Sequence, residues 1–362
     1  MPIAVRRAVA EDPDFLEAQP SLVLRLGPRL PQSATVMFNV HLDTVAGDQP
    51  VGLADGRFHG RGAIDAKGPA VGLLAGVRAA VAAEPSLGRD VGVLIQAVVG
   101  EEGGAMGVFG TRKLVRMGFT GRLNIFCEPT GGRLLTRSTA SMTAQVQVRG
   151  ADAIDDAPAA GHNATVLLGH LAAHLARTLP AYAGSGQVCV AGLETGPLHN
   201  KVYGSGRLLI NLSYGSAADG ERLERAADRE LRAGLAGFRE AFADSPLLAR
   251  TVRDAEDIVR LDWLKRRLPA LASHDPWAED LLTGRAGLTP WPADLPAFTC
   301  DAIWAADLPG TFTAVLGPGD LETNNAHAEG EFADRADLEQ FAGDVARLLT
   351  AFTTSSDLTR TT

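Results

Sequence analysis

The stretch that most constrains the fold is 36–45, an apolar run that ends on His41-Leu42-Asp43. Its length and apolar character predict a buried strand of a sheet. Side chains alternate between the two faces of a strand, so His41 and Asp43 should point the same way at its carboxyl end. A metal-bound imidazole usually donates its other ring N–H to an acceptor, and Asp43 is placed to accept it. The alternative is a polar strand end with a hydrogen-bonded histidine, and the triplet alone does not distinguish the two.

Acidic side chains occupy three later turns or strand ends. Asp65 follows a glycine-rich turn and precedes a helix expected over 66–83, Glu101 and Glu102 follow a strand expected over 91–99, and Glu128 ends a strand expected over 122–127. In an open α/β sheet, ligands bind outside the carboxyl ends of the strands, so these acids are expected to share a site with His41. As alternatives, Asp65 is a helix N-cap, and Glu101 and Glu102 are solvated acids before a helix over 105–117.

The length of 362 residues predicts two domains. After Gly131-Gly132 the expected elements follow the β-α-β-β-α-β order of a ferredoxin-like module. These elements cover 141–148, 163–179, 187–193, 207–212, 221–242 and 258–264. We therefore expect an inserted domain over 136–268 within an α/β catalytic domain formed by 1–135 and 269–362. The second part of that domain should hold a strand over 312–316 and a final helix over 335–352.

Composition restricts the partners and the compartment. The formal net charge is −9 and there is no basic run, which argues against a nucleic acid or an anionic membrane as partner. The three cysteines are too few and too scattered for a disulfide framework, so we expect small buried thiols and a reducing compartment. No signal peptide or membrane span is evident, and a cytoplasmic location is expected.

Histidines and carboxylates without a cysteine cluster form the ligand set of a hydrolytic zinc site, or of a similar site for cobalt or manganese. A pair of metal ions needs one shared carboxylate, about two further ligands for each ion, and a base for the water between them. The sequence supplies this inventory. A metal-free α/β protein with solvated acids is the alternative.

Five motifs span nearly the whole chain: His41-Leu-Asp43, Gly60-Arg-Gly-Ala-Ile-Asp65-Ala-Lys-Gly-Pro, Glu101-Glu102-Gly, Glu128-Pro-Thr, and His327 after Gly317-Pro-Gly. In this order they resemble the two-zinc exopeptidase and deacylase family, which includes acetylornithine deacetylase, succinyl-diaminopimelate desuccinylase, aminoacylase and the glutamate carboxypeptidases. The Asp65-Ala-Lys-Gly-Pro form is similar to the branch that deacylates lysine or ornithine intermediates, some of them held on a small carrier protein. The resemblance implies a zinc-exopeptidase-like domain with a mostly parallel sheet, and an inserted lid and dimerisation domain.

The resemblance also implies a role for each motif residue. Asp65 would bridge two divalent metal ions, His41 and Glu128 would complete one site, and Glu102 and His327 would complete the other. Glu101 would be the general base that takes a proton from the bridging water, with Asp43 assisting catalysis.

The second domain departs from the family pattern. Relatives carry a histidine that helps to hold the oxyanion a few residues before a Pro-x-x-Gly-x-Asn-Ala signature, but the matching position here is Ile154. His162 lies nearby and is a candidate substitute, against the alternative of a surface histidine at a helix start.

A second departure concerns the arginine that grips a substrate carboxylate in relatives. After Asn200, the positions of the usual proline and arginine read Tyr203 and Ser213, which leaves Arg207 as the nearest guanidinium. We therefore take Asn200 and Arg207, with His162, as candidate substrate contacts.

Two hypotheses for the function follow. The first is a metal-dependent amidohydrolase that cleaves an N-acyl amino acid or a peptide-like amide bond, acts as a homodimer, and in its biosynthetic form deacylates an intermediate on a carrier protein. The second keeps the metal site but makes the protein a binding protein or a partner-dependent enzyme, because Ile154 and Ser213 replace family residues.

Overall fold

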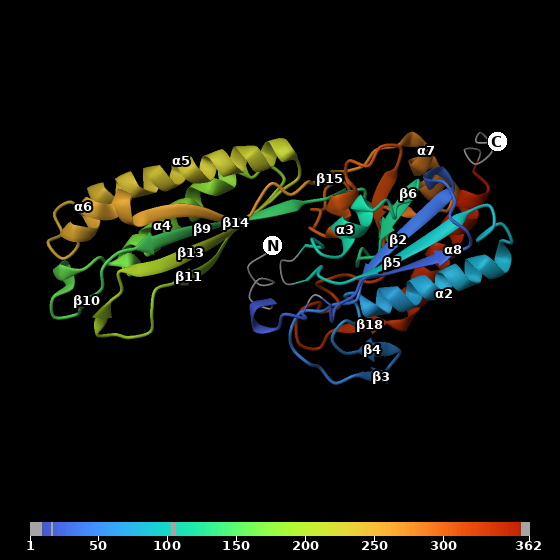
Figure 1. Cartoon of the computed structure of the whole chain (residues 1–362), viewed down its shortest axis with the longest axis horizontal. Coiled ribbons are helices and arrows are strands. Elements are labelled where there is room, and N and C mark those ends of the chain that lie inside the picture. Colours follow the sequence, from blue (N-terminus) through green and yellow to red (C-terminus); the bar gives the residue numbers. More distant parts are fainter. Residues whose placement is uncertain (1–8, 16, 103–105, 356–362) are drawn as a thin grey trace. The chain divides into compact units, whose positions relative to one another are not determined.

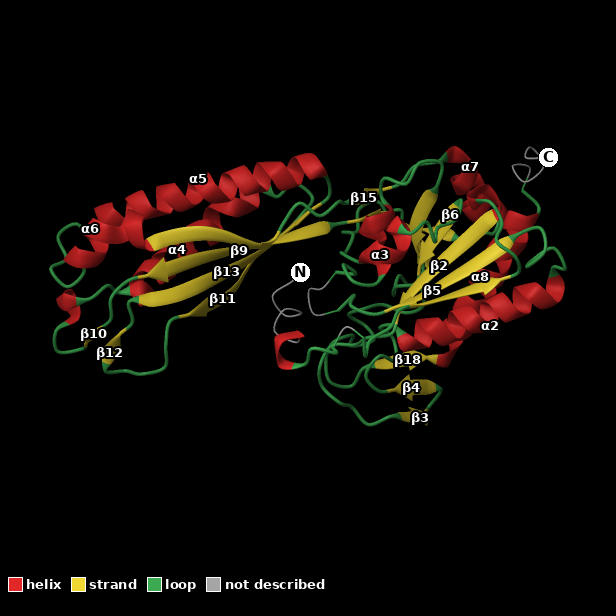
Figure 2. Cartoon of the chain, in the orientation of Figure 1, coloured by secondary structure: helices red, strands yellow, loops and turns green. Residues whose placement is uncertain are grey.

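The structure is a computed structural model that describes residues 9–15, 17–102 and 106–355. The chain forms two compact units, one made of Met1–Ser138 with Leu271–Thr362 and one made of Thr139–Ala270. The boundaries expected from the sequence followed residues 135 and 268, so both lie within three residues of these limits. Figure 2 shows the helices and strands of each unit.

A five-stranded mixed sheet forms the centre of the first unit (Figure 1). Its order is β1 (Leu22–Leu26), β5 (Gly92–Val98), β2 (Thr35–His41), β6 (Leu123–Phe126) and β17 (Phe312–Val315). Strand β1 is antiparallel to β5, and the other pairs are parallel. Strands β2, β5, β6 and β17 are buried along their whole length, which explains their apolar runs.

Both faces of this sheet are covered. Val36 and Phe38 of β2 belong to a core with α2 (Lys67–Ala83), α8 (Arg335–Thr353) and α7 (Pro276–Glu279), which continues as a π-helical turn over Asp280–Arg285. Met37 points to the opposite core, beside the 3-10 helix η5 (Asp301–Ala305). Helices α2 and α8 pack so closely that a Cβ on Gly76 would lie 2.5 Å from the Ala342 carbonyl oxygen.

A second, three-stranded antiparallel sheet lies in the first unit. It pairs β18 (Phe332–Asp334) with β4 (Arg57–His59), and β4 with β3 (Gly52–Ala54). From the sequence, only a glycine-rich turn was expected before Asp65. The β4–β18 pairing brings the segment before Asp65 beside the segment after His327. A pairing between segments so far apart in sequence cannot be predicted from local patterns.

Helix α3 (Thr111–Arg116) begins later than the predicted start at residue 105. Met106 and Gly107 have φ angles of 52° and 59°, which are left-handed and incompatible with a helix. Residues 103–105 lie outside the described part of the chain.

The unit also contains two short strand pairs: β7 (Arg133–Leu134) with β16 (Thr289–Pro290), and β8 (Arg137–Ser138) with β15 (Leu271–Ala272).

The second unit is an antiparallel sheet covered by helices. Its strand order is β11 (Val188–Glu194), β13 (Ser205–Tyr214), β9 (Ala140–Arg149) and β14 (Val259–Lys265), the order of a ferredoxin-like module. Helices α4 (Ala164–Thr178) and α5 (Ala217–Ala241) share the core of the sheet. The sequence did not predict α6 (Ala249–Ile258) or the pair β10 (Ala153–Ile154) with β12 (Lys201–Val202). Helix α5 carries many charged residues. Among the described residues, no helix is both long and apolar enough to cross a bilayer.

Candidate metal centre

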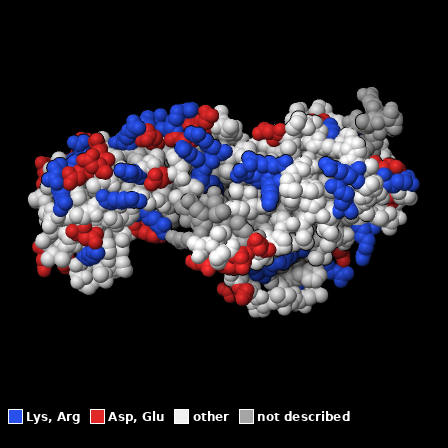
Figure 3. Space-filling view, in the orientation of Figure 1, with Lys and Arg blue, Asp and Glu red and all other residues white. Residues whose placement is uncertain are grey.

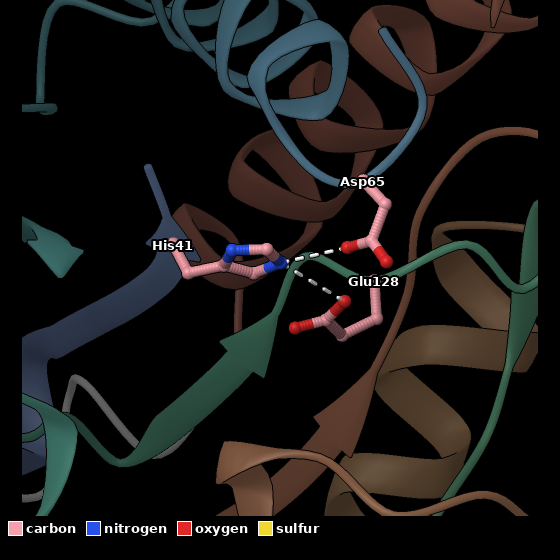
Figure 4. Close-up of side chains that lie close together, drawn as sticks. All are labelled: His41, Asp65 and Glu128. Carbon is pink, nitrogen blue, oxygen red and sulfur yellow. Dashed lines mark hydrogen bonds and ion pairs between the residues drawn. The ribbon is translucent and has the colours of Figure 1, made fainter. Parts of the chain in front are cut away.

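The carboxyl ends of three neighbouring strands bring the candidate ligands together. His41 is the last residue of β2, Glu101 follows the end of β5, and Glu128 follows the end of β6. Figure 4 shows His41, Glu128 and Asp65, from the loop before α2, with their polar atoms directed at one another. Parallel strands that all end at one edge thus create the site.

Asp65 lies between the two histidines. Its Oδ1 is 2.7 Å from His41 Nε2, and its Oδ2 is 2.8 Å from His327 Nε2. On the first side, Glu128 Oε2 is 3.8 Å from the same nitrogen of His41. On the second side, Glu102 Oε1 is 2.9 Å from His327 Nε2. The result is two groups of three candidate ligands that share Asp65, with one candidate ligand atom of each residue within 4.8 Å of the others in its group.

The acids and imidazoles of the site perturb one another strongly. Burial raises the pKa of Glu128 to about 8. Burial acts to lower the pKa of His41, but the neighbouring Glu128 and Asp65 raise it well above its usual value. The hydrogen bonds with His327 and His41 hold the pKa of Asp65 below its usual value despite burial. Carboxylates crowded around two imidazoles are a donor set suited to hard or borderline divalent cations.

The structure corrects the predicted role of Asp43. His41 Nδ1 lies 2.9 Å from the backbone carbonyl oxygen of Asp43, whereas the Asp43 carboxylate is 3.7 Å away. That carboxylate instead accepts hydrogen bonds from the backbone nitrogens of Glu101 and Glu102, at 3.4 and 3.1 Å. The predicted residue orients His41, but through its main chain, because its side chain turns towards the loop after β5.

Glu101 lies beside both ligand groups. Its carboxylate belongs to a cluster with His41 and Glu102 in which one candidate ligand atom of each residue lies within 4.8 Å of the others. Burial raises the pKa of Glu101 well above its usual value, and the negative charges of Asp301 and Glu128 add to this effect. A carboxylate that binds a proton readily next to the ligands is suited to general acid–base chemistry.

Sequence analysis did not identify Asp301, a buried carboxylate near the site. Its Oδ2 accepts a hydrogen bond from Thr111 Oγ1 at 2.5 Å, and its Oδ1 has no partner in the described part of the chain. Burial raises the pKa of Asp301 to about 7. On the same short helix, Trp304 Nε1 donates to the Met106 carbonyl oxygen at 2.6 Å. Helix η5 therefore holds the loop that carries Glu101 and Glu102.

The three predicted substrate contacts belong to the second unit. His162 is buried and not at the surface: its Nδ1 accepts a hydrogen bond from the Ala151 nitrogen at 2.8 Å, and its Nε2 lies 3.0 Å from Asp254 Oδ2. Arg207 forms an ion pair with Glu194 at 2.7 Å. Asn200 lies exposed in the turn before β12. The contacts of His162 favour a role in fastening the start of α4, because both ring nitrogens are engaged.

Comparison with known proteins agrees with this geometry. The profile of peptidase family M20/M25/M40 matches residues 37–351. A curated relative, the putative [LysW]-lysine/[LysW]-ornithine hydrolase of Aeropyrum pernix, is 30% identical over 175 residues, which are 48% of this chain and 46% of that protein. The match thus spans about half of the length of that relative.

Solved structures share the fold at low identity. The dipeptidase Dug1p of Saccharomyces cerevisiae has a TM-score of 0.68 at 12% identity, over 98% of this chain and 92% of that chain. The YXEP protein of Bacillus subtilis, described as a dinuclear metal-binding peptidase of the M20 family, has a TM-score of 0.58 at 12% identity, over 97% and 92%. The profile spans most of the chain, and these solved structures share its fold. The chain belongs to the peptidase M20 family, as the five motifs predicted.

Proposed function

We propose that this protein hydrolyses an amide bond of an N-acyl amino acid or a peptide-like substrate at a site for two divalent metal ions. The observation that carries the proposal is the position of Asp65, whose two carboxylate oxygens face His41 on one side and His327 on the other. A shared carboxylate with two further ligands on each side is the arrangement that a two-metal site needs. In this proposal His41 and Glu128 hold one ion, and Glu102 and His327 hold the other.

Each residue of the site has a distinct task. Bound cations would polarise the scissile carbonyl and make a water molecule more acidic. Glu101 takes a proton from the attacking water while the oxygen of this water bonds to the carbonyl carbon. Glu101 then delivers that proton to the leaving nitrogen as the C–N bond breaks. Asp43 keeps His41 in position through its carbonyl oxygen and holds Glu101 and Glu102 through its carboxylate.

We propose zinc as the native metal, with cobalt or manganese as alternatives. Two imidazoles and three carboxylates, with no cysteine thiolate among them, suit all three ions. The test is metal analysis of the purified protein, followed by assays of the protein loaded with each ion on a panel of N-acyl amino acids and dipeptides. We expect two ions per chain and hydrolysis; no bound metal, or no turnover on any substrate, would contradict the proposal.

A substitution separates chemistry from metal binding. Glu101→Gln should lower kcat by about 10²–10⁴-fold while both ions stay bound, because it removes only the group that moves the proton. The exposed Glu322→Gln is the matched control and should behave as wild type. Full activity of Glu101→Gln would exclude Glu101 as the general base.

For the substrate, we propose an acylated lysine or ornithine carried on a small protein. The similarity to the [LysW]-lysine/[LysW]-ornithine hydrolase supports this choice, as does the Asp65-Ala-Lys-Gly-Pro motif. The measurement is kcat/KM for an N-acyl lysine presented free in solution and on a carrier protein. A higher value for the carrier-bound form is expected, and equal values would restrict the function to small N-acyl amino acids.

We further propose a homodimer formed through the second unit, which would act as a lid and dimerisation domain. Strand β14 lies at an edge of the four-stranded sheet, and β14 and α5 together line an open groove of about 830 Å³. Figure 3 shows basic and acidic side chains interleaved along α5, which suits a self-complementary surface. Analytical ultracentrifugation should find a dimer.

We also propose a cytoplasmic location, which the three unpaired cysteines support.

The contacts of His162 support a second candidate function, that of an enzyme that needs a partner chain for activity. Both nitrogens of that ring are already hydrogen-bonded, so it has no free group for an oxyanion. In this case the missing contact comes from another chain, and the specific activity should fall when the protein is diluted to the monomer. Activity that is independent of concentration, down to a verified monomer, would exclude this candidate.

A further inference from the structure

Glu331 is a buried carboxylate that belongs to neither ligand group. Its side chain is 1% exposed, and it lies four residues after His327, just before β18. A buried carboxylate is costly unless charged partners and hydrogen bonds compensate the loss of water. The partners of Glu331 therefore indicate what the residue is for.

These partners lie on the loop that carries Asp65. Glu331 Oε1 accepts hydrogen bonds from the backbone nitrogens of Ile64 and Asp65, at 3.2 and 3.3 Å. Its Oε2 accepts from Arg61 Nη1 at 2.7 Å, and this ion pair is shielded because the Arg61 side chain is only 13% exposed. One carboxylate thus fixes both the start and the end of the segment that leads to the shared ligand.

The main chain around Glu331 is held equally well. Gln49 Oε1 accepts from the backbone nitrogens of Gly330 and Glu331, at 3.0 and 3.1 Å, and Gln49 Nε2 donates to the Ala328 carbonyl oxygen at 2.6 Å. The Gly60 nitrogen donates to the Glu331 carbonyl oxygen at 3.1 Å. The loop after His327 is therefore tied to the loop before Asp65 at several points.

We propose that Glu331 is a positioning residue that sets the spacing between Asp65 and His327 and thereby holds the second metal ion. The proposal rests on the two-metal site proposed above. Glu331 contacts the backbone nitrogen of Asp65 and not its carboxylate, so both carboxylate oxygens of Asp65 remain beside His41 and His327.

The two metal sites should depend on Glu331 to different degrees. His41 is the last residue of β2, and Glu128 follows β6; the buried central sheet fixes both without help from Glu331. His327, by contrast, lies in a loop and its side chain is 50% exposed, and Glu102 also comes from a loop. Loss of Glu331 should therefore weaken the site of Glu102 and His327 far more than the site of His41 and Glu128.

The decisive variant is Glu331→Gln, which keeps the volume of the side chain but removes its charge and one acceptor oxygen. Asp334→Asn is the matched control: Asp334 lies three residues further along, and its ion pair with Arg57, at 2.9 Å, also joins β18 to β4 but is exposed. Metal-free wild type and variants are titrated with Co²⁺, and the two binding steps are followed by calorimetry and by visible absorption.

For wild type and Asp334→Asn we expect two binding steps of unchanged affinity. For Glu331→Gln we expect the second step to weaken by about 10–100-fold while the first changes much less, as for other residues that orient a metal ligand. Two binding steps as tight as those of wild type would overturn the proposal, and so would equal weakening of both steps.

A folding defect does not leave the question open. If circular dichroism shows that Glu331→Gln does not fold, Gln49→Ala serves as the second variant. Gln49 is partly exposed, and its removal eliminates contacts to the loop after His327. We expect this variant to weaken the second binding step by about 10-fold. Unchanged affinity in Gln49→Ala would then refute the role of this loop. If wild type itself binds fewer than two ions, the proposed function fails, whereas two tight ions in both wild type and variant refute only the role of Glu331.

Discussion

The Asp43 carboxylate accepts a hydrogen bond from the backbone nitrogen of Glu102 at 3.1 Å. Through this contact the carboxyl end of β2 holds the loop after β5, so the residue that positions His41 also positions the acids on the neighbouring strand. The two halves of the site are thus coupled by main-chain contacts as well as by the ligands.

Replacing Asp43 should therefore impair catalysis without unfolding the protein. Asp43→Ala frees the backbone nitrogens of Glu101 and Glu102, and we expect kcat to fall by about 10–100-fold. Asp48→Ala, at an exposed position of the same loop, is the control and should leave kcat unchanged. Steady-state kinetics on a substrate found in the panel decide the matter, and an unaltered kcat in Asp43→Ala would show that the loop is held by other contacts.

Asp301 should make the stability of the metal-free protein depend on pH. Because burial raises its pKa to about 7, the folded state keeps a proton that the unfolded chain releases near pH 4. The contribution of Asp301 to stability is therefore largest below about pH 4 and is lost as the pH rises to about 7.

Asp301→Asn cannot ionise and should escape this loss. The difference between the Tm of Asp301→Asn and the Tm of wild type should be larger at pH 8 than at pH 5, by about 5 °C or more. This is the shift expected for about 2 kcal/mol in a unit of this size. Thermal unfolding at the two pH values measures the effect, with the exposed Asp307→Asn as control. An equal Tm difference at both values would mean that Asp301 is ionised throughout.

Removing the metal should destabilise the protein. A cation that binds only the folded state adds about 2.7 kcal/mol at a concentration 100-fold above its Kd, and the crowded acids around Asp65 lose their counter-charge without it. The Tm should fall with a chelator and rise with metal concentration. In Asp65→Ala, which lacks the shared ligand, this dependence should be much weaker; an undiminished dependence would place the metal elsewhere.

The packing of α2 against α8 should not tolerate a side chain at Gly76. A Cβ there would lie 2.5 Å from the Ala342 carbonyl oxygen and 2.7 Å from Val345 Cβ. Gly76→Ala should cost about 1–3 kcal/mol through overpacking. Gly169→Ala, in the interior of α4 where nothing lies within 4 Å, should instead add about 0.5–1 kcal/mol. Denaturant unfolding measures both, and equal effects would argue against the close helix contact.

The sequence predicted the central elements well, because their patterns are local. Buried parallel strands are apolar throughout, which revealed β2, β5 and β6, and the amphipathic or alanine-rich helices α2, α5 and α8 follow periodic patterns. The motif acids and His41 were found because each ends or follows a recognisable strand or turn, whereas His327 was found only through the resemblance to the exopeptidase and deacylase family.

Other features depend on tertiary contacts that leave no local trace. The shortening of α3 results from left-handed residues at Met106 and Gly107, and the pairing of β18 with β4 joins segments far apart in sequence. The role of the Asp43 side chain depends on where the loop after β5 passes. Asp301 and Glu331 resemble ordinary acids in the sequence, and only their burial and partners set them apart.

The parallel pairing of β17 with β6 has a consequence for how the protein is made. The whole second unit is synthesised between these two strands, and His327 is synthesised after β17. A growing chain on the ribosome therefore keeps β6 as an open edge, and Asp65 without its second imidazole, while the continuous second unit can already fold. At the two-metal site proposed above, the second ion could then be held only after His327 has been synthesised, and a chain released before β17 would lack this ligand.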